Sequence, residues 1–123
     1  MNKPMSVKLS RRAYDHAQEL IKEGRVVIDD RDDWSEHQPT TQAENEYIDE
    51  HGYAAYGLWH LGVDTDKNPD TKARYHFPYG DFADVHRCAI LSAESRAAQN
   101  KYADIQSATA HLHGMLEAVR AGR

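Results

Sequence analysis

The sequence has little of what marks secreted, membrane-spanning or nucleotide-binding proteins. Its 123 residues include a single cysteine, Cys88, which excludes an internal disulfide framework and is typical of a reducing compartment. No apolar run is long enough to cross a bilayer, and the first residues lack the charged-then-apolar pattern of a signal peptide. We therefore expect a cytoplasmic protein without a membrane partner.

The common catalytic motifs are also missing. The sequence contains no GxSxG, GxGxxG or P-loop motif, and no HExxH zinc motif. Cys88 with a histidine would supply the elements of a nucleophilic pair, but a lone cysteine in an alanine-rich helix is more typical of a small packed side chain. These absences favour a protein without catalytic activity, but they leave open whether the chain is an enzyme.

Positive charge is scarce in the middle of the chain. The formal net charge is −5, and residues 29–70 contain two basic and twelve acidic side chains, or −10. Such a segment is typical of a solvated surface, and the lack of a basic stripe argues against a nucleic-acid partner. The acidic run at 29–33 lacks the spacing, central glycine and final glutamate of an EF-hand loop, which argues against calcium.

What the second half of the chain does contain is the pattern of a β-hairpin. Apolar side chains alternate over residues 56–63 and again over residues 74–79, which predicts two half-buried strands. The polar residues 64–71 between them predict the connecting loop.

Two helices are predicted after the hairpin. The apolar period changes to three and four residues at Asp81, which is a suitable N-cap, and Asn100 suits the helix end. Residues 102–120 have the cleanest amphipathic pattern of the chain. Because the connection is so short, we expect an antiparallel helix pair.

Two shorter helices are expected in the first half. Ser10 is a suitable N-cap for a helix that ends at Gly24, and residues 41–44 form a capping box for a helix that ends near Glu50. The apolar run Val26–Ile28 is a candidate third strand: either this run pairs with an edge of the hairpin, or that edge pairs between two chains.

Together these elements predict a single α+β domain over residues 1–123. Its small antiparallel sheet packs against the C-terminal antiparallel helix pair, with the two shorter N-terminal helices around them. We expect residues 53–120 to form the core, residues 1–7 to be disordered and residues 29–39 to be an acidic linker.

Eight histidines are many for a chain of this length, and they are the natural candidates for metal ligands. His86 and Cys88 are two residues apart, as are His111 and His113, and on a helix such neighbours point to opposite sides. Antiparallel packing of the two helices would still bring His86 near His111. A zinc site between the helices is therefore a hypothesis.

A second histidine pair lies on the predicted hairpin. If Trp59 faces Phe77, the register places His60 opposite His76, whereas a register shifted by two makes them diagonal neighbours. Either arrangement supports the hypothesis of a weak metal site or a pH-sensitive pair. The alternative is two partly exposed strand residues beside acidic neighbours. No cofactor is expected from the sequence; the metal hypothesis names His60, His76, His86 and His111 as ligands, with zinc as the ion.

Several motifs of the sequence resemble those of a family of small uncharacterised bacterial proteins, with related stretches in phage-associated open reading frames. The resemblance is carried by GLWHLGV at 57–63, KARYHFPYGDF at 72–82 and VHRC at 85–88, and it covers about residues 34–119. The family is a domain of unknown function, so the resemblance implies no activity, cofactor or site. It implies only that the hairpin and the helix pair form one unit.

The leading functional prediction is a non-enzymatic intracellular interaction module that binds a protein partner or forms a homodimer. It is based on the missing catalytic motifs, the unpaired edge of the hairpin and the acidic surface. The alternative is a metal-binding protein or metal-dependent enzyme that uses the histidines and Cys88.

Overall fold

The structure, a computed structural model, describes residues 7–123. The predicted disorder of residues 1–7 therefore lies outside the described residues, except at Val7, which begins the first strand. In chain order the elements are β1 (Val7–Leu9), α1 (Arg11–Lys22), β2 (Val26–Val27), α2 (Trp34–His37), α3 (Thr41–Gly57), β3 (His60–Asp64), the 3-10 helix η1 (Lys72–Arg74), β4 (Tyr75–Pro78), β5 (Val85–His86), α4 (Arg87–Gln99) and α5 (Ala103–Ala121).

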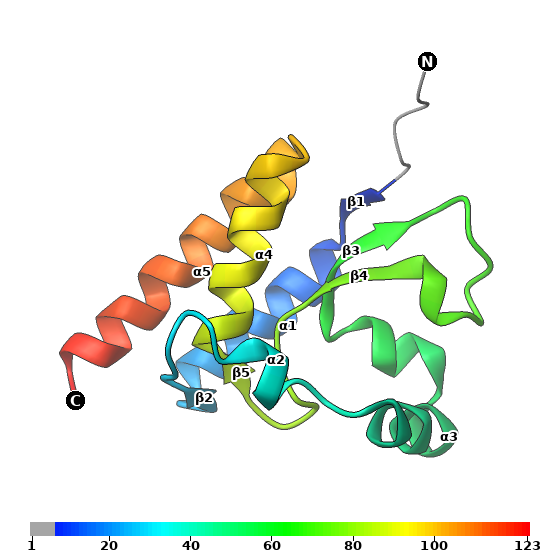
Figure 1. Cartoon of the computed structure of the whole chain (residues 1–123), viewed down its shortest axis with the longest axis horizontal. Coiled ribbons are helices and arrows are strands. Elements are labelled where there is room, and N and C mark those ends of the chain that lie inside the picture. The colour runs from blue at the N-terminus through cyan, green and yellow to red at the C-terminus, as the bar shows by residue number, and fades with distance from the viewer. Residues whose placement is uncertain (1–6) are drawn as a thin grey trace.

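These elements confirm the predicted α+β class. Helices α4 and α5 lie side by side at one end of the molecule, and β3, β4 and α3 lie at the other (Figure 1). No helix in residues 7–123 combines the length and the apolar character needed to cross a bilayer.

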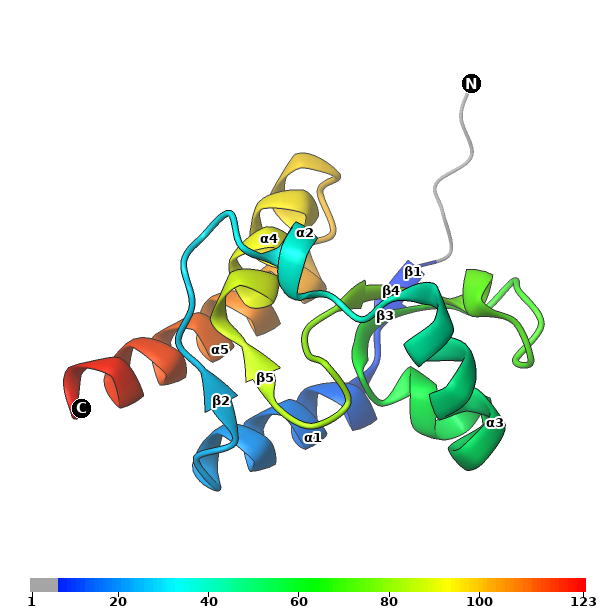
Figure 2. The ribbon, with the colours of Figure 1, turned by 60° about the horizontal axis from the view of Figure 1, so that its bottom comes forward.

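The antiparallel sheet has three strands in the order β1-β3-β4. Its central and outer strands β3 and β4 are the predicted hairpin, but the third strand is β1 and not Val26–Ile28. Residues Val26–Val27 do form a strand, β2, which pairs in parallel with β5, and the two lie side by side in Figure 2. The pairing prediction was wrong because so short an apolar run has no alternation that would identify its partner.

The hairpin adopts the shifted register. His60 lies opposite Pro78, and Gly62 lies opposite His76, so the two histidines are diagonal neighbours and the directly opposed alternative is wrong. Gly62 permits close packing at this point, because a Cβ atom there would lie 2.8 Å from Cδ2 of Phe77. Any side chain at position 62 would therefore push its neighbours aside, and glycine avoids this.

Helices α4 and α5 form the predicted pair, but α4 begins at Arg87 rather than at Asp81. The Asp81 carboxylate does accept backbone N–H groups, those of Ala83 at 3.0 Å and Asp84 at 2.7 Å. They belong to a turn, in which Phe82 has a φ of 72°, so the side chain that resembles a helix cap stabilises a bend instead. The helix is thereby delayed until after β5.

The third helix also differs from the prediction. Its N-cap is Thr40, whose hydroxyl accepts the N–H of Ala43, and it continues past Glu50 to Gly57. Gly52, just after the predicted end, is a kink with φ 85° and ψ 169°, a conformation open essentially to glycine alone. The first strand of the hairpin consequently starts at His60 and not at residue 56.

One hydrophobic core joins the sheet to the helices. The side chains of Trp59, Phe77 and Leu112 are all buried in the same cluster, and α1 contributes Leu20 and Ile21 to it. The predicted packing of the aromatic hairpin against the C-terminal helices is therefore correct, with α1 as an additional partner.

Candidate metal centre

The second, parallel strand pair positions a cluster of polar side chains next to the core. Asp29 follows β2, and Cys88 lies in the first turn of α4, directly after β5. The pairing of β2 with β5 brings these segments together, and the Cys88 N–H donates to Oδ1 of Asp29 at 2.7 Å. Arg87 fixes the same loop, because its Nη1 donates to the Asp29 carbonyl at 3.0 Å.

The other oxygen of Asp29 has three further neighbours. Its Oδ2 lies 2.7 Å from His86 Nδ1 and 2.8 Å from His37 Nδ1, and it accepts the thiol of Cys88 at 3.0 Å. The ligand atoms of Asp29, His37, His86 and Cys88 all lie within 4.8 Å of one another. We call these four residues the Asp29 cluster.

His86 is held from both sides. Its Nε2 lies 2.8 Å from Oδ2 of Asp81, and its ring packs against Trp34 with centroids 5.6 Å apart. Both ring nitrogens therefore lie within hydrogen-bond distance of a carboxylate, Nδ1 of that of Asp29 and Nε2 of that of Asp81. The turn at residue 81 thus has a role beyond the backbone, because it orients the imidazole.

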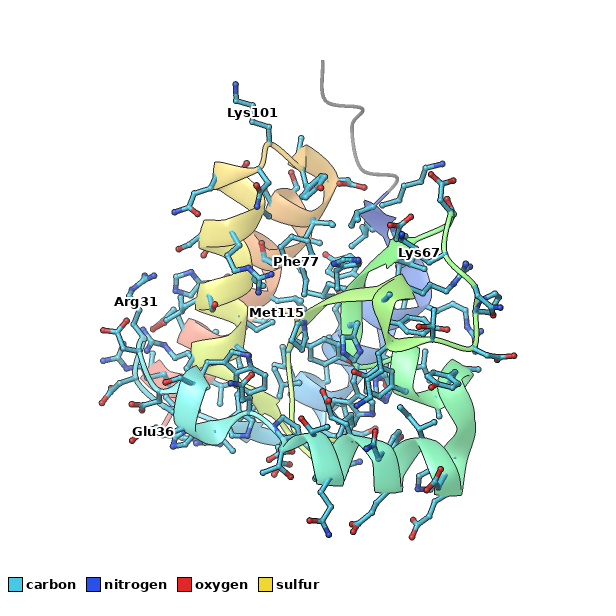
Figure 3. All side chains as sticks on the ribbon, turned by 45° about the vertical axis from the view of Figure 1, so that its right-hand side comes forward. Arg31, Glu36, Lys67, Phe77, Lys101 and Met115 are labelled. Carbon is cyan, nitrogen blue, oxygen red and sulfur yellow. The ribbon has the colours of Figure 1, made fainter. Side chains whose placement is uncertain are left out.

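The cluster is buried apart from one member. Asp29, His86 and Cys88 are buried, whereas the His37 side chain is 38% exposed at the end of α2, which lies against α4. In Figure 3 the labelled side chains of Arg31 and Glu36 point outward from the segment that also carries Asp29 and His37. The predicted acidic linker 29–39 is therefore a structured segment that covers the cluster.

The electrostatics favour a cation at Asp29. Burial by itself would raise the pKa of this carboxyl group, but the hydrogen bonds from Cys88, His37 and His86 outweigh it and lower the pKa to about 2. The hydrogen bond to Asp29 raises the pKa of His37. For Asp81, hydrogen bonds from the backbone of the turn and from His86 likewise overcome burial and lower the pKa.

The thiol of Cys88 has the opposite character to a catalytic nucleophile. Burial first, and then the hydrogen bond to Asp29 and its negative charge, raise the pKa of Cys88. Nucleophilic cysteines need a lowered pKa and access to substrate, and Cys88 is fully buried. The arrangement suits a metal ligand better, because a bound cation would displace the thiol proton.

The chain matches no protein-family model, no curated protein and no solved structure. The resemblance to a bacterial and phage-associated family thus stays a prediction, and the chemistry of the site is argued from its own residues.

The structure places the predicted ligands in different surroundings. His86 belongs to the Asp29 cluster, but His111 does not: it is exposed and meets the ring of Tyr14 edge-on at 6.1 Å. Among residues 7–123, His60 and His76 also lie outside any group of three or more candidate ligands. His60 is buried, and its Nδ1 donates to the carbonyl of Tyr56 at 2.9 Å.

Asp29 and His37 were missed by sequence reasoning. Asp29 was considered only as part of a calcium-like acidic run, and His37 was not singled out from the linker. His86 and Cys88 were expected to point apart because a helix was assumed at both positions. Since α4 begins at Arg87, His86 is still in the strand, and the change of backbone direction lets the two side chains converge. A later helix start is the signal that would have found the pair.

Proposed function

We propose that this chain is a zinc-binding protein, with the Asp29 cluster as its ligand set. One observation supports this most directly: a single buried carboxylate oxygen accepts hydrogen bonds from two imidazoles and a thiol. These are the groups that coordinate zinc once their protons are lost. The mixture of sulfur, nitrogen and oxygen donors favours zinc over magnesium or calcium, which prefer oxygen.

The proposed site is structural rather than catalytic. Four protein ligands complete a tetrahedral zinc, whereas catalytic sites keep a position for water or substrate. Ligand atoms around such an ion are about 3.3–3.7 Å apart, somewhat wider than the present hydrogen bonds of 2.7–3.0 Å. Zinc would therefore replace the shared protons and lengthen the three contacts to Oδ2 of Asp29, joining residues 29–37 to the start of α4.

The hydrogen bond on the far side of the His86 ring supports the same proposal. A histidine that binds zinc through one nitrogen usually donates its other N–H to a carboxylate. His86 is arranged in this way, with Nδ1 in the cluster and Nε2 at Asp81. We expect Asp81→Asn to weaken zinc binding by about 10–100-fold, as measured by competition with a chromogenic chelator.

The test is metal analysis of protein purified without a histidine tag, followed by cobalt substitution. We expect one zinc per chain, and a cobalt form with tetrahedral d–d bands and a thiolate charge-transfer band. Cys88→Ser should abolish that charge-transfer band and weaken binding strongly. The matched control is His111→Gln, which removes another predicted ligand outside the cluster and should leave stoichiometry and spectrum unchanged. Equal metal content in wild type and Cys88→Ser would contradict the proposal.

The predicted protein partner or homodimer is independent of this site. It stays a prediction, and sedimentation of the zinc-loaded and metal-free chain would test whether association depends on the ion.

A further inference from the structure

A second polar site lies away from the Asp29 cluster, where the antiparallel sheet meets the turn between α4 and α5. It is a cavity of about 130 Å³ lined by Val7, His76, Phe77, Arg96, Asn100 and Tyr102. By volume it has room for about four water molecules or a ligand of a few non-hydrogen atoms. Phe77 lies between α4 and the sheet in Figure 3, and Lys101 marks the end of α4.

The polar side chains of this cavity are suited to donate hydrogen bonds. Arg96 carries five N–H donors and no acceptor, and no carboxylate is among the lining residues. Within residues 7–123 the guanidinium has no ion pair. It lies over the Phe77 ring at 5.2 Å, which holds it in place by a cation–π contact. The hydroxyl of Tyr102 adds a further donor, and the NH₂ group of Asn100, which already donates to the Arg96 carbonyl at 2.9 Å, has a second N–H.

An unpaired imidazole nitrogen is a separate indication of a missing partner. Nε2 of His76 has no hydrogen-bond partner within the described part of the chain. The atom has almost no accessible surface, so a ligand in the cavity would reach it only after the imidazole turns toward the cavity. Buried polar atoms are nearly always paired, so an exception calls for an explanation such as a ligand. His76 is also placed closely, because a Cβ atom on the facing Gly62 would lie 3.3 Å from its Cβ.

The backbone at the cavity is strained as well. Phe77 has a φ of 60°, which is a genuine outlier for a bulky residue. Such conformations persist where the surroundings impose them, and they cluster at ligand sites. Here the strained residue is the one that supports Arg96.

We infer that this cavity binds a small oxyanion, the carboxylate or phosphate group of a small molecule, through Arg96 and, once its ring turns toward the cavity, through His76. The planar guanidinium matches either group with two parallel hydrogen bonds. Neither residue belongs to the proposed zinc site, so each site is tested independently of the other.

The test is a titration followed by two-dimensional NMR, with the Arg Nε–H and imidazole signals included. The probes are inorganic phosphate and acetate, each added at constant ionic strength set with chloride. We expect saturable shifts at residues 76, 77 and 96 rather than at residues 29, 86 and 88. Tighter binding of phosphate would indicate a phosphorylated ligand, and tighter binding of acetate a carboxylate.

Variants distinguish a built site from general positive potential. Arg96→Gln should weaken binding at least about tenfold, because the charge and the paired donors are both lost. The matched control is Lys101→Asn, which removes an exposed cation from the same turn and should change affinity less than about twofold. Arg96→Lys keeps the positive charge but loses the two parallel N–H donors of the guanidinium, and should weaken binding at least about threefold. This variant tests the inference if Arg96→Gln does not fold. Non-saturating shifts in the wild type, or equal affinity in wild type and the folded Arg96 variant, would overturn the inference.

Discussion

The Asp29 carboxylate can be tested for its contribution to stability before any metal is added. Asp29→Asn keeps the shape of the side chain, but replaces one acceptor oxygen by an NH₂ group. In the wild type both oxygens are used, Oδ1 by the Cys88 N–H and Oδ2 by His37, His86 and the Cys88 thiol. In either orientation of the amide that the substitution introduces, its NH₂ group faces N–H or S–H donors that the wild-type carboxylate accepts.

The size of the effect follows from the pKa and from the unpaired groups. The pKa of Asp29 falls from 3.8 to about 2, which corresponds to about 2–3 kcal/mol of stability from the ionised form. Buried donors that lose their acceptor add about 1–2 kcal/mol. We therefore expect Asp29→Asn to lower the free energy of unfolding by about 3–5 kcal/mol at pH 7 in chelator-treated protein.

Urea unfolding followed by circular dichroism measures this difference. Because the folded pKa is lowered, the stabilisation by Asp29 is present above pH 3.8 and is lost as the pH falls through about 2. The difference in the free energy of unfolding between wild type and Asp29→Asn should therefore become smaller as the pH falls from 3.8 to about 2. Asp32→Asn, which changes an exposed aspartate in the same segment, is the control and should stay within about 0.5 kcal/mol of wild type. A loss below about 1 kcal/mol for Asp29→Asn would refute the reasoning.

Three other substitutions test the fold away from the cluster. Burial lowers the pKa of His60 from 6.5 to about 4, so stability that is present above pH 6.5 should decrease by about 3 kcal/mol as the pH falls to 4. In His60→Asn the amide can replace the donor to the Tyr56 carbonyl. The free energy of unfolding of this variant, measured by urea titration at several pH values, should lack this decrease. Gly52→Ala should lower the midpoint of thermal unfolding by the equivalent of about 1–3 kcal/mol, because φ 85° with ψ 169° is strained for any side chain. Gly114→Ala, in the exposed middle of α5 where an added Cβ atom would meet nothing within 4 Å, should raise it by about 0.5–1 kcal/mol, and the same sign in both glycine variants would contradict the assigned backbone.

The parts of the fold that the sequence predicts are those with a local repeating pattern. The alternation in the hairpin and the three- and four-residue steps of α5 each repeat several times within one element, so they identify its type without knowledge of its neighbours. The hairpin and the C-terminal helices were predicted to pack together for this reason, and Phe77 and Leu112 are both buried in their common core. The extent of the hairpin and of α5 follows from the same patterns to within a few residues.

The parts that were missed depend on contacts between distant segments. Strand β1 and strands β2 and β5 contain three residues or fewer, too few for any period to appear. Their assignment rests on partners far along the chain, as when the N–H of Leu9 donates to the Asp104 carboxylate at 2.8 Å. Asp81 shows the related ambiguity, since an aspartate suits a turn as well as a helix start.

The same limit explains why the metal centre was found only in part. Its four residues come from two regions that are joined by a parallel pair of two-residue strands, so no spacing in the sequence marks them as a set. A pair that short has little stability of its own. The hydrogen bonds of Asp29 to Cys88 in the first turn of α4 therefore help to stabilise the strand pair that positions Asp29. A bound ion would act on the same junction, which is why its proposed role is to fix the covering segment 29–37 rather than to perform chemistry.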